Sequence, residues 1–440
     1  MINTGLPRLL LWAGIILVVA PVWPQQAASP PESPMLASLL SDIAKGNAAA
    51  LDDFWKTVDQ RKTPIIEKLP GDEKHVLATF LWKGTGDTKD VVVEARPNSV
   101  DSPTDPRSHM RLLPGTNIWC LSHHLPLDAE FIYQLLVNLP GSEASLSATA
   151  LQQAARLDPF NPNHYPEDYD ASQPWRVGSI ARMPVVPDNP WLAKKTGVPA
   201  GRVQEHIVKS GFLKQVSDRT VWVYTPAGEN LDKPNLLILF DGGVYTNRIP
   251  TPRILDNLYA DHKIGPAVAV FVDNGGGAAR SVDLYFSDAF VKFLTDDLLP
   301  WVERQYKFKA DPLRTVLGGD SRGGLAATYA ALRRPDVFGK VLSQSGAFQV
   351  EKKGADSDEP EWLARQFAQA EKSNVFFCLD VGQMEDRRGG GTTLLAANRH
   401  LRDILMAKGY RTHYFEVYGD HDPVHWRRTL PEALMATLGN

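Results

Sequence analysis

Hydrophobic and polar positions change their spacing twice along this chain of 440 residues. Between residues 34 and 69 apolar side chains recur every three or four positions, which predicts one or two short helices. The spacing then falls to two in four short runs, which lie at residues 75–82, 90–95, 117–121 and 130–137. Short alternating runs separated by turn residues predict a small β-sandwich of the early-set or immunoglobulin-like type.

From residue 201 onward the pattern changes again, because continuous apolar runs alternate with helical stretches. Two strands are expected at 203–209 and 219–225. Five more apolar runs follow at 236–240, 267–272, 314–317, 341–343 and 375–379. Strands that are apolar on both sides and separated by helices predict a parallel sheet covered on both faces. The second half of the chain is therefore expected to be an α/β domain.

A proline-rich segment separates the predicted β-sandwich from the predicted α/β domain. Residues 158–200 contain eight prolines and little periodicity, so this segment is predicted to be an extended linker. The expected organisation is a signal peptide at 1–28, a helical segment with the β-sandwich at 29–157, the linker at 158–200 and the α/β domain at 201–440.

The first residues have the pattern of an export signal. Arg8 supplies a positive charge, residues 9–23 form an uncharged and mostly apolar run, and residues 24–29 are polar and small. A retained membrane anchor is the alternative, but the run is shorter than the roughly 20 residues of a spanning helix and Pro21 interrupts it. We expect cleavage, a periplasmic mature protein and no stable association with the membrane.

Charge and cysteine content narrow the possible functions. The net charge is −4, with 43% hydrophobic and 22% charged residues, which indicates a globular protein and no basic surface for nucleic acid. Of the two cysteines, Cys378 falls in an apolar strand and Cys120 in the other domain, so both are expected to be free and buried. Neither lies in a metal-binding motif, and we expect no metal site and no cofactor.

The most informative motif is Gly319-Asp-Ser-Arg-Gly323, which follows one of the short strands and precedes a helical pattern at 325–334. A G-x-S-x-G sequence between a strand and a helix is the nucleophile elbow of α/β-hydrolases. The turn is so sharp that we expect Gly319 and Gly323 to be required, because a Cβ there would collide with neighbouring backbone. Ser321 is the predicted nucleophile, and residues 201–440 are the predicted α/β-hydrolase catalytic domain.

A serine nucleophile needs a base, and the base needs an orienting acid. His421 directly follows the strand pattern at 412–418 and is preferred as the base over His425. The acid should follow the strand at 375–379, where three residues qualify by position, namely Asp380, Glu385 and Asp386.

The oxyanion of the tetrahedral intermediate needs two backbone N–H donors. One follows the nucleophile and belongs to Arg322. The other is expected from the glycine-rich loop at 240–245, from Gly242 or Gly243.

With these residues collected, the chain resembles the enterochelin (ferric enterobactin) esterase family over most of its length. In the first half the resemblance rests on Gly115-Thr-Asn-Ile-Trp119, Tyr133-Gln134 and Asp158-Pro-Phe-Asn-Pro162. In the second half it rests on Leu239-Phe-Asp-Gly242, Arg280-Ser-Val-Asp-Leu284, Gly319-Asp-Ser-Arg-Gly-Gly324, Leu342-Ser-Gln-Ser-Gly346, Gly419-Asp-His-Asp422 and Trp426-Arg427.

The resemblance implies a serine esterase that hydrolyses the trilactone of a catecholate siderophore and so weakens its hold on Fe(III). It implies Ser321 as nucleophile and His421 as base. It also selects Glu385 as the acid, because Gly382-Gln-Met-Glu385 falls where the family has Gly-x-Arg-Glu. The chain departs from that pattern at Met384, which replaces Arg, and at Asp386, which replaces Pro.

A ferric tris-catecholate is a trianion with flat aromatic walls, so its pocket should offer guanidinium groups and aromatic faces. Arg280, Arg322 and Trp426 are the predicted substrate-binding residues, and Gly243 with Arg322 the predicted oxyanion hole. Two alternatives remain. A β-sandwich joined to this kind of hydrolase is also the plan of feruloyl and other carbohydrate-ester esterases, and a protein with a defective triad would bind the siderophore without cleaving it.

Overall fold

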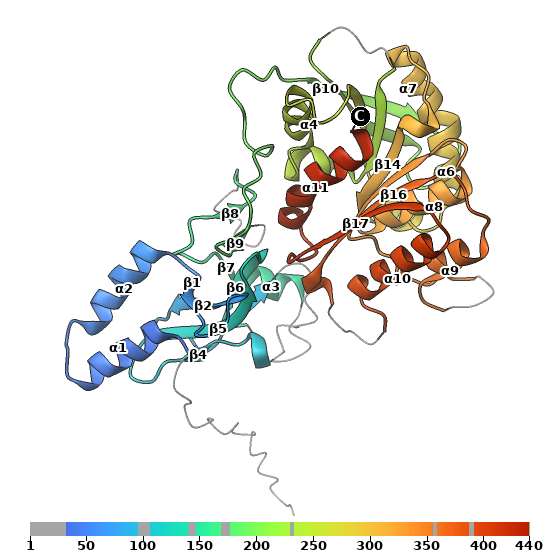
Figure 1. Cartoon of the computed structure of the whole chain (residues 1–440). Coiled ribbons are helices and arrows are strands. Elements are labelled where there is room, and N and C mark those ends of the chain that lie inside the picture. Colours follow the sequence, from blue (N-terminus) through green and yellow to red (C-terminus); the bar gives the residue numbers. More distant parts are fainter. Residues whose placement is uncertain are drawn as a thin grey trace, which may run out of the picture.

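The structure is a computed structural model that describes residues 32–95, 106–139, 147–168, 177–228, 233–354, 359–386 and 391–439. The predicted signal peptide at 1–28 lies outside these residues. Two domains lie side by side, and helices α1 (Pro34–Ala44) and α2 (Ala50–Arg61) occupy the side of the first domain that is remote from the second (Figure 1). No helix in the described residues is long and apolar enough to cross a membrane.

The first domain is the predicted β-sandwich. One sheet has the order β1-β2-β5-β4 and the other β3-β6-β9-β8, with the short β7 paired to β6. The early strands are β1 (Ile65–Lys68), β2 (His75–Lys83), β3 (Val91–Ala95), β4 (Arg111–Leu112), β5 (Ile118–Pro126) and β6 (Glu130–Val137). Phe80 of β2 packs edge-on against Tyr133 of β6, so the apolar faces of the two sheets meet in one core. Helices α1 and α2 cover the other face of the first sheet.

The predicted linker at 158–200 is wrong for much of its length. This region holds β8 (His164–Tyr165) and β9 (Gly178–Arg182), and β9 pairs antiparallel with β6. The prolines flank β9 rather than interrupt it, so its amides remain available to the sheet. Helix α3 (Ala148–Ala154) and β7 (Ala155–Arg156) precede this segment. The first domain therefore extends at least to residue 182.

The second domain is built on an eight-stranded sheet of order β10-β11-β13-β12-β14-β15-β16-β17. All pairs from β13 to β17 are parallel, and β10 and β11 are antiparallel additions at one edge. The strands are β10 (Arg202–Lys209), β11 (Asp218–Thr225), β12 (Asn235–Phe240), β13 (Ala267–Val272), β14 (Thr315–Asp320), β15 (Lys340–Gln344), β16 (Phe376–Gly382) and β17 (Arg411–Val417).

Helices cover both faces of this sheet, as the apolar strands predict. The helical segments are η4 (Val244–Arg248), α4 (Thr251–Ala260), α5 (Gly277–Asp283), α6 (Asp288–Lys292), η5 (Phe293–Leu298), α7 (Leu299–Tyr306), α8 (Arg322–Arg333), α9 (Trp362–Gln369), α10 (Leu394–Ala407) and α11 (Pro423–Leu438). Along β12, Ile238 faces the core beneath α8, whereas Leu237 and Leu239 face the core beneath α4 and α11. Side chains alternate sides along a strand, so an apolar strand serves two cores.

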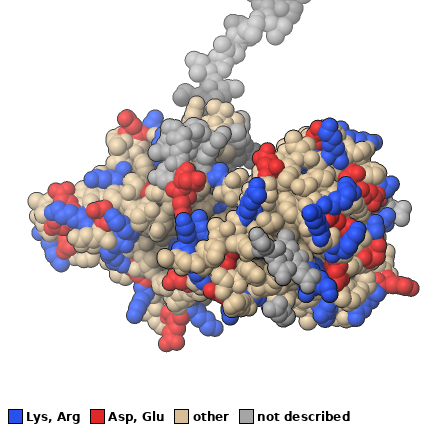
Figure 2. Space-filling view, turned by 90° about the horizontal axis from the view of Figure 1, so that it is seen from above, with Lys and Arg blue, Asp and Glu red and all other residues tan. Residues whose placement is uncertain are grey.

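Both cysteines, Cys120 and Cys378, are free and buried, which confirms that prediction. On the outside, basic and acidic side chains are interspersed over both domains on the face shown in Figure 2, in keeping with a net charge of −4.

The seam between the domains runs along the loop that follows β17. The N–H of Glu130 in β6 donates to the carbonyl of Tyr418 (3.0 Å), and the N–H of Ile132 donates to the carboxylate of Asp422 (3.1 Å). His421 therefore lies in a loop whose two sides are hydrogen-bonded to the first domain.

Candidate active site

Ser321 stands between the end of β14 and the start of α8, as the elbow motif predicts. Its backbone has φ 54° and ψ −116°, a conformation that a non-glycine residue adopts only when the surroundings impose it. Two backbone hydrogen bonds of 2.9 Å do so, from the Ser321 N–H to Gln344 and from the Ala347 N–H to the Ser321 carbonyl. The strained turn presents the side chain at the carboxyl edge of the sheet.

The glycines around the serine have different roles from those expected. A Cβ on Gly319 would lie 2.9 Å from the Cα of Gly323, so Gly319 is required. A Cβ on Gly323 would meet nothing nearer than Phe240 at 3.5 Å, an ordinary contact. The tight position is Gly324, where a Cβ would overlap the Ser343 hydroxyl and lie 3.1 Å from the Cα of Gly346. The prediction for Gly323 was wrong, because helix α8 approaches β15 one residue later.

Gly324→Ala is expected to lower the free energy of unfolding by about 1–3 kcal/mol, because the extra methyl overpacks the contact between α8 and β15. Gly323→Ala is the matched control and is expected to leave stability unchanged or raise it by up to about 1 kcal/mol through helix propensity. Urea unfolding of both variants measures the difference. Equal destabilisation of the two variants would contradict a tight contact between α8 and β15 at Gly324.

His421 lies in the loop between β17 and α11. Its Nδ1 donates to Glu385 Oε2 at 2.9 Å, and its side chain is 19% exposed. A carboxylate on Nδ1 leaves Nε2 as the nitrogen that can accept a proton. Within the described residues, His421 bonds through its side chain to Glu385 and not to the Ser321 hydroxyl; catalytic hydrogen bonds of this kind commonly tighten only when substrate binds.

Geometry separates the three candidate acids. Glu385 contacts His421, whereas Asp386 accepts a hydrogen bond from the Thr393 hydroxyl at 2.9 Å. Asp380 is buried, and its Oδ1 lies 3.1 Å from Nε2 of the second histidine, His425. Only Glu385 pairs with the candidate base.

Glu385 is held by three donors. Its Oε1 accepts from the Gly382 N–H at 2.8 Å and from the Ser345 hydroxyl at 2.6 Å, and Oε2 accepts from His421. Burial raises the pKa of this carboxyl, but the bond from His421, both imidazole charges and the bond from Ser345 outweigh it and hold the pKa below its usual value. The carboxyl is therefore ionised and fixed in orientation.

The two predicted backbone N–H donors lie at the same edge of the sheet. Arg322 is the first residue of α8 and Gly243 caps η4, positions at which N–H groups have no partner within the helix. They follow β14 and β12, which are parallel neighbours. Gly242 is the glycine that allows close approach, because a Cβ there would lie 2.7 Å from the backbone of Phe271.

The three predicted substrate-binding side chains have different surroundings. Arg280 forks onto the Asp241 carboxylate, with its Nε 2.8 Å from Oδ1 and its Nη2 2.6 Å from Oδ2. Arg322 lies over the ring of Tyr285, 5.8 Å from its centroid. Trp426 is only 6% exposed, so it is no open platform for a substrate ring. Trp426 was predicted from its place beside a loop, but the first turn of α11 directs the indole inward.

Comparisons with known proteins follow the same division of the chain. The family model "Enterochelin esterase, N-terminal" matches residues 77–192, and the Esterase model matches residues 215–437. The iron(III) enterobactin esterase of Dickeya dadantii is 30% identical over 92% of this chain and 95% of its own length. The chain belongs to the enterochelin esterase family. It is accordingly a carboxylic ester hydrolase.

Two further members of the enterochelin esterase family match nearly the whole chain. The iron(III) salmochelin esterase of Escherichia coli O6:H1 is 27% identical over 91% of this chain and 96% of its own length. The crystal structure of the ferric enterobactin esterase from Salmonella typhimurium superposes with a TM-score of 0.70 at 23% identity, covering 87% of this chain and 98% of the other. The latter likeness supports the shared fold, an α/β-hydrolase domain behind an N-terminal sheet domain.

Sequence reasoning missed two side chains that organise this esterase site. Ser345 bridges the Trp426 indole N–H, at 3.0 Å, and the Glu385 carboxylate. Asp241, in the glycine-rich loop that follows β12, holds Arg280 and has φ 54°, while Ser345 has φ 48°. Both follow predicted strands at the carboxyl edge, which was the available signal, but their partners come from distant parts of the chain.

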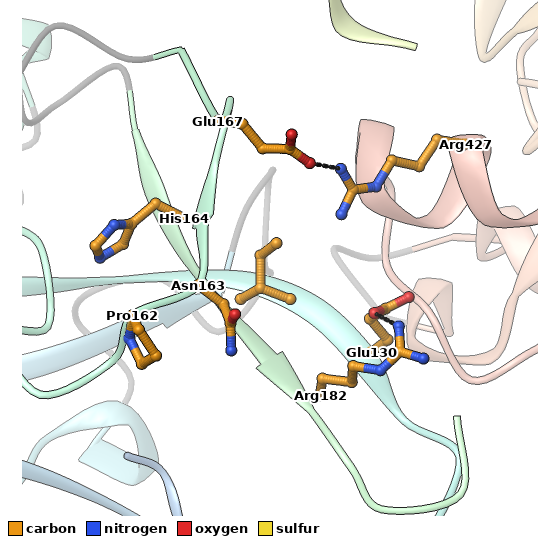
Figure 3. Close-up of a pocket in the computed structure, with 8 residues that line it drawn as sticks. Glu130, Pro162, Asn163, His164, Glu167, Arg182 and Arg427 are labelled. Carbon is orange, nitrogen blue, oxygen red and sulfur yellow. Dashed lines mark hydrogen bonds and ion pairs between the residues drawn. The ribbon is translucent and has the colours of Figure 1, made fainter. Parts of the chain in front are cut away.

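The enterochelin-esterase-type first domain also shares a cavity with the hydrolase domain. This cavity of about 360 Å³ is lined by Glu130, Pro162, Asn163, His164, Glu167, Ile180, Arg182 and Arg427. Figure 3 shows two ion pairs at its wall, Glu167 with Arg427 (3.4 Å) and Glu130 with Arg182 (2.8 Å). Arg427 directly follows Trp426 in the first turns of α11, so α11 contributes side chains to the cavity wall and to the candidate site.

Proposed function

We propose that this protein is a serine esterase that hydrolyses the ester bonds of a siderophore, with the trilactone of a ferric catecholate such as ferric enterobactin as its substrate. The observation that carries the proposal is the pairing of His421 with the buried Glu385 at the edge of the sheet where Ser321 occupies a strained elbow. Two relatives that match over more than nine-tenths of the chain are an iron(III) enterobactin esterase and an iron(III) salmochelin esterase.

The proposed reaction follows from these positions. The Ser321 oxygen adds to the ester carbonyl while its proton passes to His421 Nε2, and Glu385 stabilises the imidazolium. The N–H groups of Arg322 and Gly243 bind the oxyanion. The intermediate expels the seryl alkoxide of the substrate, which takes the proton from His421 and leaves an acyl-enzyme. Water then adds by the same route and releases Ser321.

Cationic side chains near the oxyanion loop support an anionic substrate. A cavity of about 700 Å³ extends along η4, the segment that begins after Gly243. Four of the side chains that line it are cationic, against two carboxylates, and the cations are Lys194, Arg248, Arg253 and Arg427. Arg322, stacked on Tyr285, adds a guanidinium beside the nucleophile. Guanidinium groups and an aromatic face suit a catecholate.

The decisive experiment incubates the purified protein with ferric enterobactin and, separately, with a feruloylated sugar, and identifies the products by mass spectrometry. We expect linear or shorter 2,3-dihydroxybenzoyl-serine oligomers from the first substrate. Turnover of the feruloyl ester alone would assign the protein to the carbohydrate-ester esterases instead.

The pH dependence of hydrolysis should report His421. Burial lowers the pKa of this imidazole, but the bond to Glu385, the Glu385 charge and the nearby Asp320 raise it more, so it lies above the ordinary 6.5. A general base must be neutral, so activity is present above the pKa and lost below it. We expect kcat/KM to fall about tenfold per pH unit on the acid side, with a midpoint above pH 6.5. A midpoint well below that value would argue against His421.

We also propose a periplasmic location for the mature protein, on the strength of the apolar run at 9–23 behind Arg8. Cell fractionation with sequencing of the mature N-terminus tests it. A product that retains residues 1–28 in the membrane fraction would favour an anchor.

A further inference from the structure

A second imidazole lies behind the first. His425, in the first turn of α11, has 0% of its side chain exposed. Its Nδ1 contacts the carbonyl of Asp420 at 2.8 Å and lies 3.5 Å from Glu385 Oε1. Its Nε2 lies 3.1 Å from Asp380 Oδ1. The proposed ester hydrolysis uses Ser321, His421 and Glu385. It assigns no role to the fully buried pair of His425 and Asp380.

The oxygens around His425 define its protonation. A carbonyl can only accept a hydrogen bond, so the Nδ1 that faces Asp420 carries a proton. Nε2 lies within ion-pair distance of Asp380 but outside hydrogen-bond geometry, and the charge of that carboxylate also favours a proton. Burial lowers the pKa of His425, but Asp380 and Glu385 outweigh it and raise the pKa to about 9. Burial also raises the pKa of Asp380, and the contacts of both ring nitrogens favour a proton on His425.

Two glycines make room for this arrangement. A Cβ on Gly419 would lie 3.1 Å from both Cβ and Cγ of His425, closer than nearly all real contacts. A Cβ on Gly382 would overlap the carbonyl of Gly419 and lie 2.9 Å from Glu385 Oε1. The backbone on both sides is thus shaped to hold the second imidazole against the carboxylate that serves the first.

The carboxylates around His425 need a nearby positive charge, because they are buried. Four carboxylates act on or adjoin His425: Asp380 on β16, Glu385 on η7 (Gln383–Glu385), and Asp420 and Asp422 in the loop before α11. His421 lies beyond Glu385, and Asp320 of β14 acts on His421 from the elbow side. Without His425, the buried Asp380 would lose the imidazole that it contacts, and Glu385 would keep only His421. Buried charges are stable only when paired, so the proton on His421 would be held more tightly.

We propose that His425 is a positioning residue whose imidazolium neutralises the buried Asp380, so that the Asp380 charge does not hold the proton on His421 and the base releases it near neutral pH. The inference deepens the proposed function, because it rests on His421 acting as the base in ester hydrolysis. His425 itself touches no reacting atom. Within the described residues, no group of three or more His, Cys, Asp or Glu side chains is arranged to hold a metal ion.

The test compares pH profiles of kcat/KM on p-nitrophenyl butyrate for the wild type, His425→Gln and the double variant Asp380→Asn with His425→Gln. His425→Gln is expected to move the acid limb upward by about one pH unit, a loss of about tenfold at pH 6.5, with little change at pH 9. The double variant removes both charges and should return the limb close to its wild-type position. A single-variant profile that coincides with wild type, or a double variant displaced as far as the single, would overturn the proposal.

A second measurement uses the wild-type protein and requires no activity assay. Nitrogen-15 NMR of the labelled wild-type protein should show both ring nitrogens of His425 protonated at pH 7, and a neutral tautomer there would overturn the proposal. The NMR spectrum also tests the protonation of His425 independently of the proposed ester hydrolysis. If Ser321→Ala hydrolyses the ester as fast as the wild type, the proposed function fails, while the protonation of His425 is still decided by the spectrum.

Discussion

Replacing Ser321 with alanine is expected to lower kcat for ester hydrolysis by about 10⁴-fold or more, because the proposed acyl-enzyme forms on its hydroxyl. The hydroxyl is the only atom lost, and the strained turn is held by backbone bonds to Gln344 and Ala347. Siderophore binding should therefore persist, which fluorescence quenching by the ferric complex would measure beside product formation. A variant that still cleaves the substrate would remove Ser321 from the mechanism.

Ser345→Ala is the matched control. Ser345 is also a serine with positive φ at the carboxyl edge of the sheet, one strand away. Its hydroxyl bonds to Glu385 rather than facing a substrate, so its loss should cost about tenfold or less in kcat. If both variants lost kcat equally, the loss in Ser321→Ala would not be specific to a nucleophile, and the assignment of Ser321 would be contradicted.

Glu385→Gln is the second large expected effect, a loss of about 10³- to 10⁴-fold in kcat with little change in KM. The amide keeps the size of the side chain but removes the charge that orients His421 Nδ1 and stabilises its imidazolium. Steady-state kinetics on ferric enterobactin measures it. The same change at Asp386, whose carboxylate bonds to Thr393, is the control and should stay within about threefold of wild type. If Asp386→Asn were the more damaging change, the acid would be assigned wrongly.

Local pattern predicted the central strands of this fold well, because they are short runs of apolar residues with clear ends. The runs at 236–240 and 267–272 became β12 and β13 with nearly the same bounds. The exception was the proline-rich segment at 158–200. Proline removes a backbone donor only at its own position, so composition alone could not reveal that β9, between the prolines, pairs with β6.

In the candidate site, too, local sequence did not reveal which side chains contact one another. Positions after strands pointed to Ser321, His421 and a set of three acids, because the carboxyl ends of parallel strands share one edge. Position could not choose Glu385 among the acids, and the choice came from the resemblance to a family. Nor could it foresee that Arg280 is engaged by Asp241 or that the indole of Trp426 points inward to Ser345. These partners are separated by dozens of residues along the chain.

By itself, the sequence determined the two kinds of domain, the elbow serine and the neighbourhood in which its partners would be found. Those features depend on periodicity and on residues adjacent in the chain, and both are local. Only the tertiary structure decided which carboxylate meets His421, which glycine is indispensable beside β15, and that His425 is enclosed with Asp380. Such pairings depend on how β14, β15, β16 and α11 pack together, and burial then sets the charge that each side chain can carry.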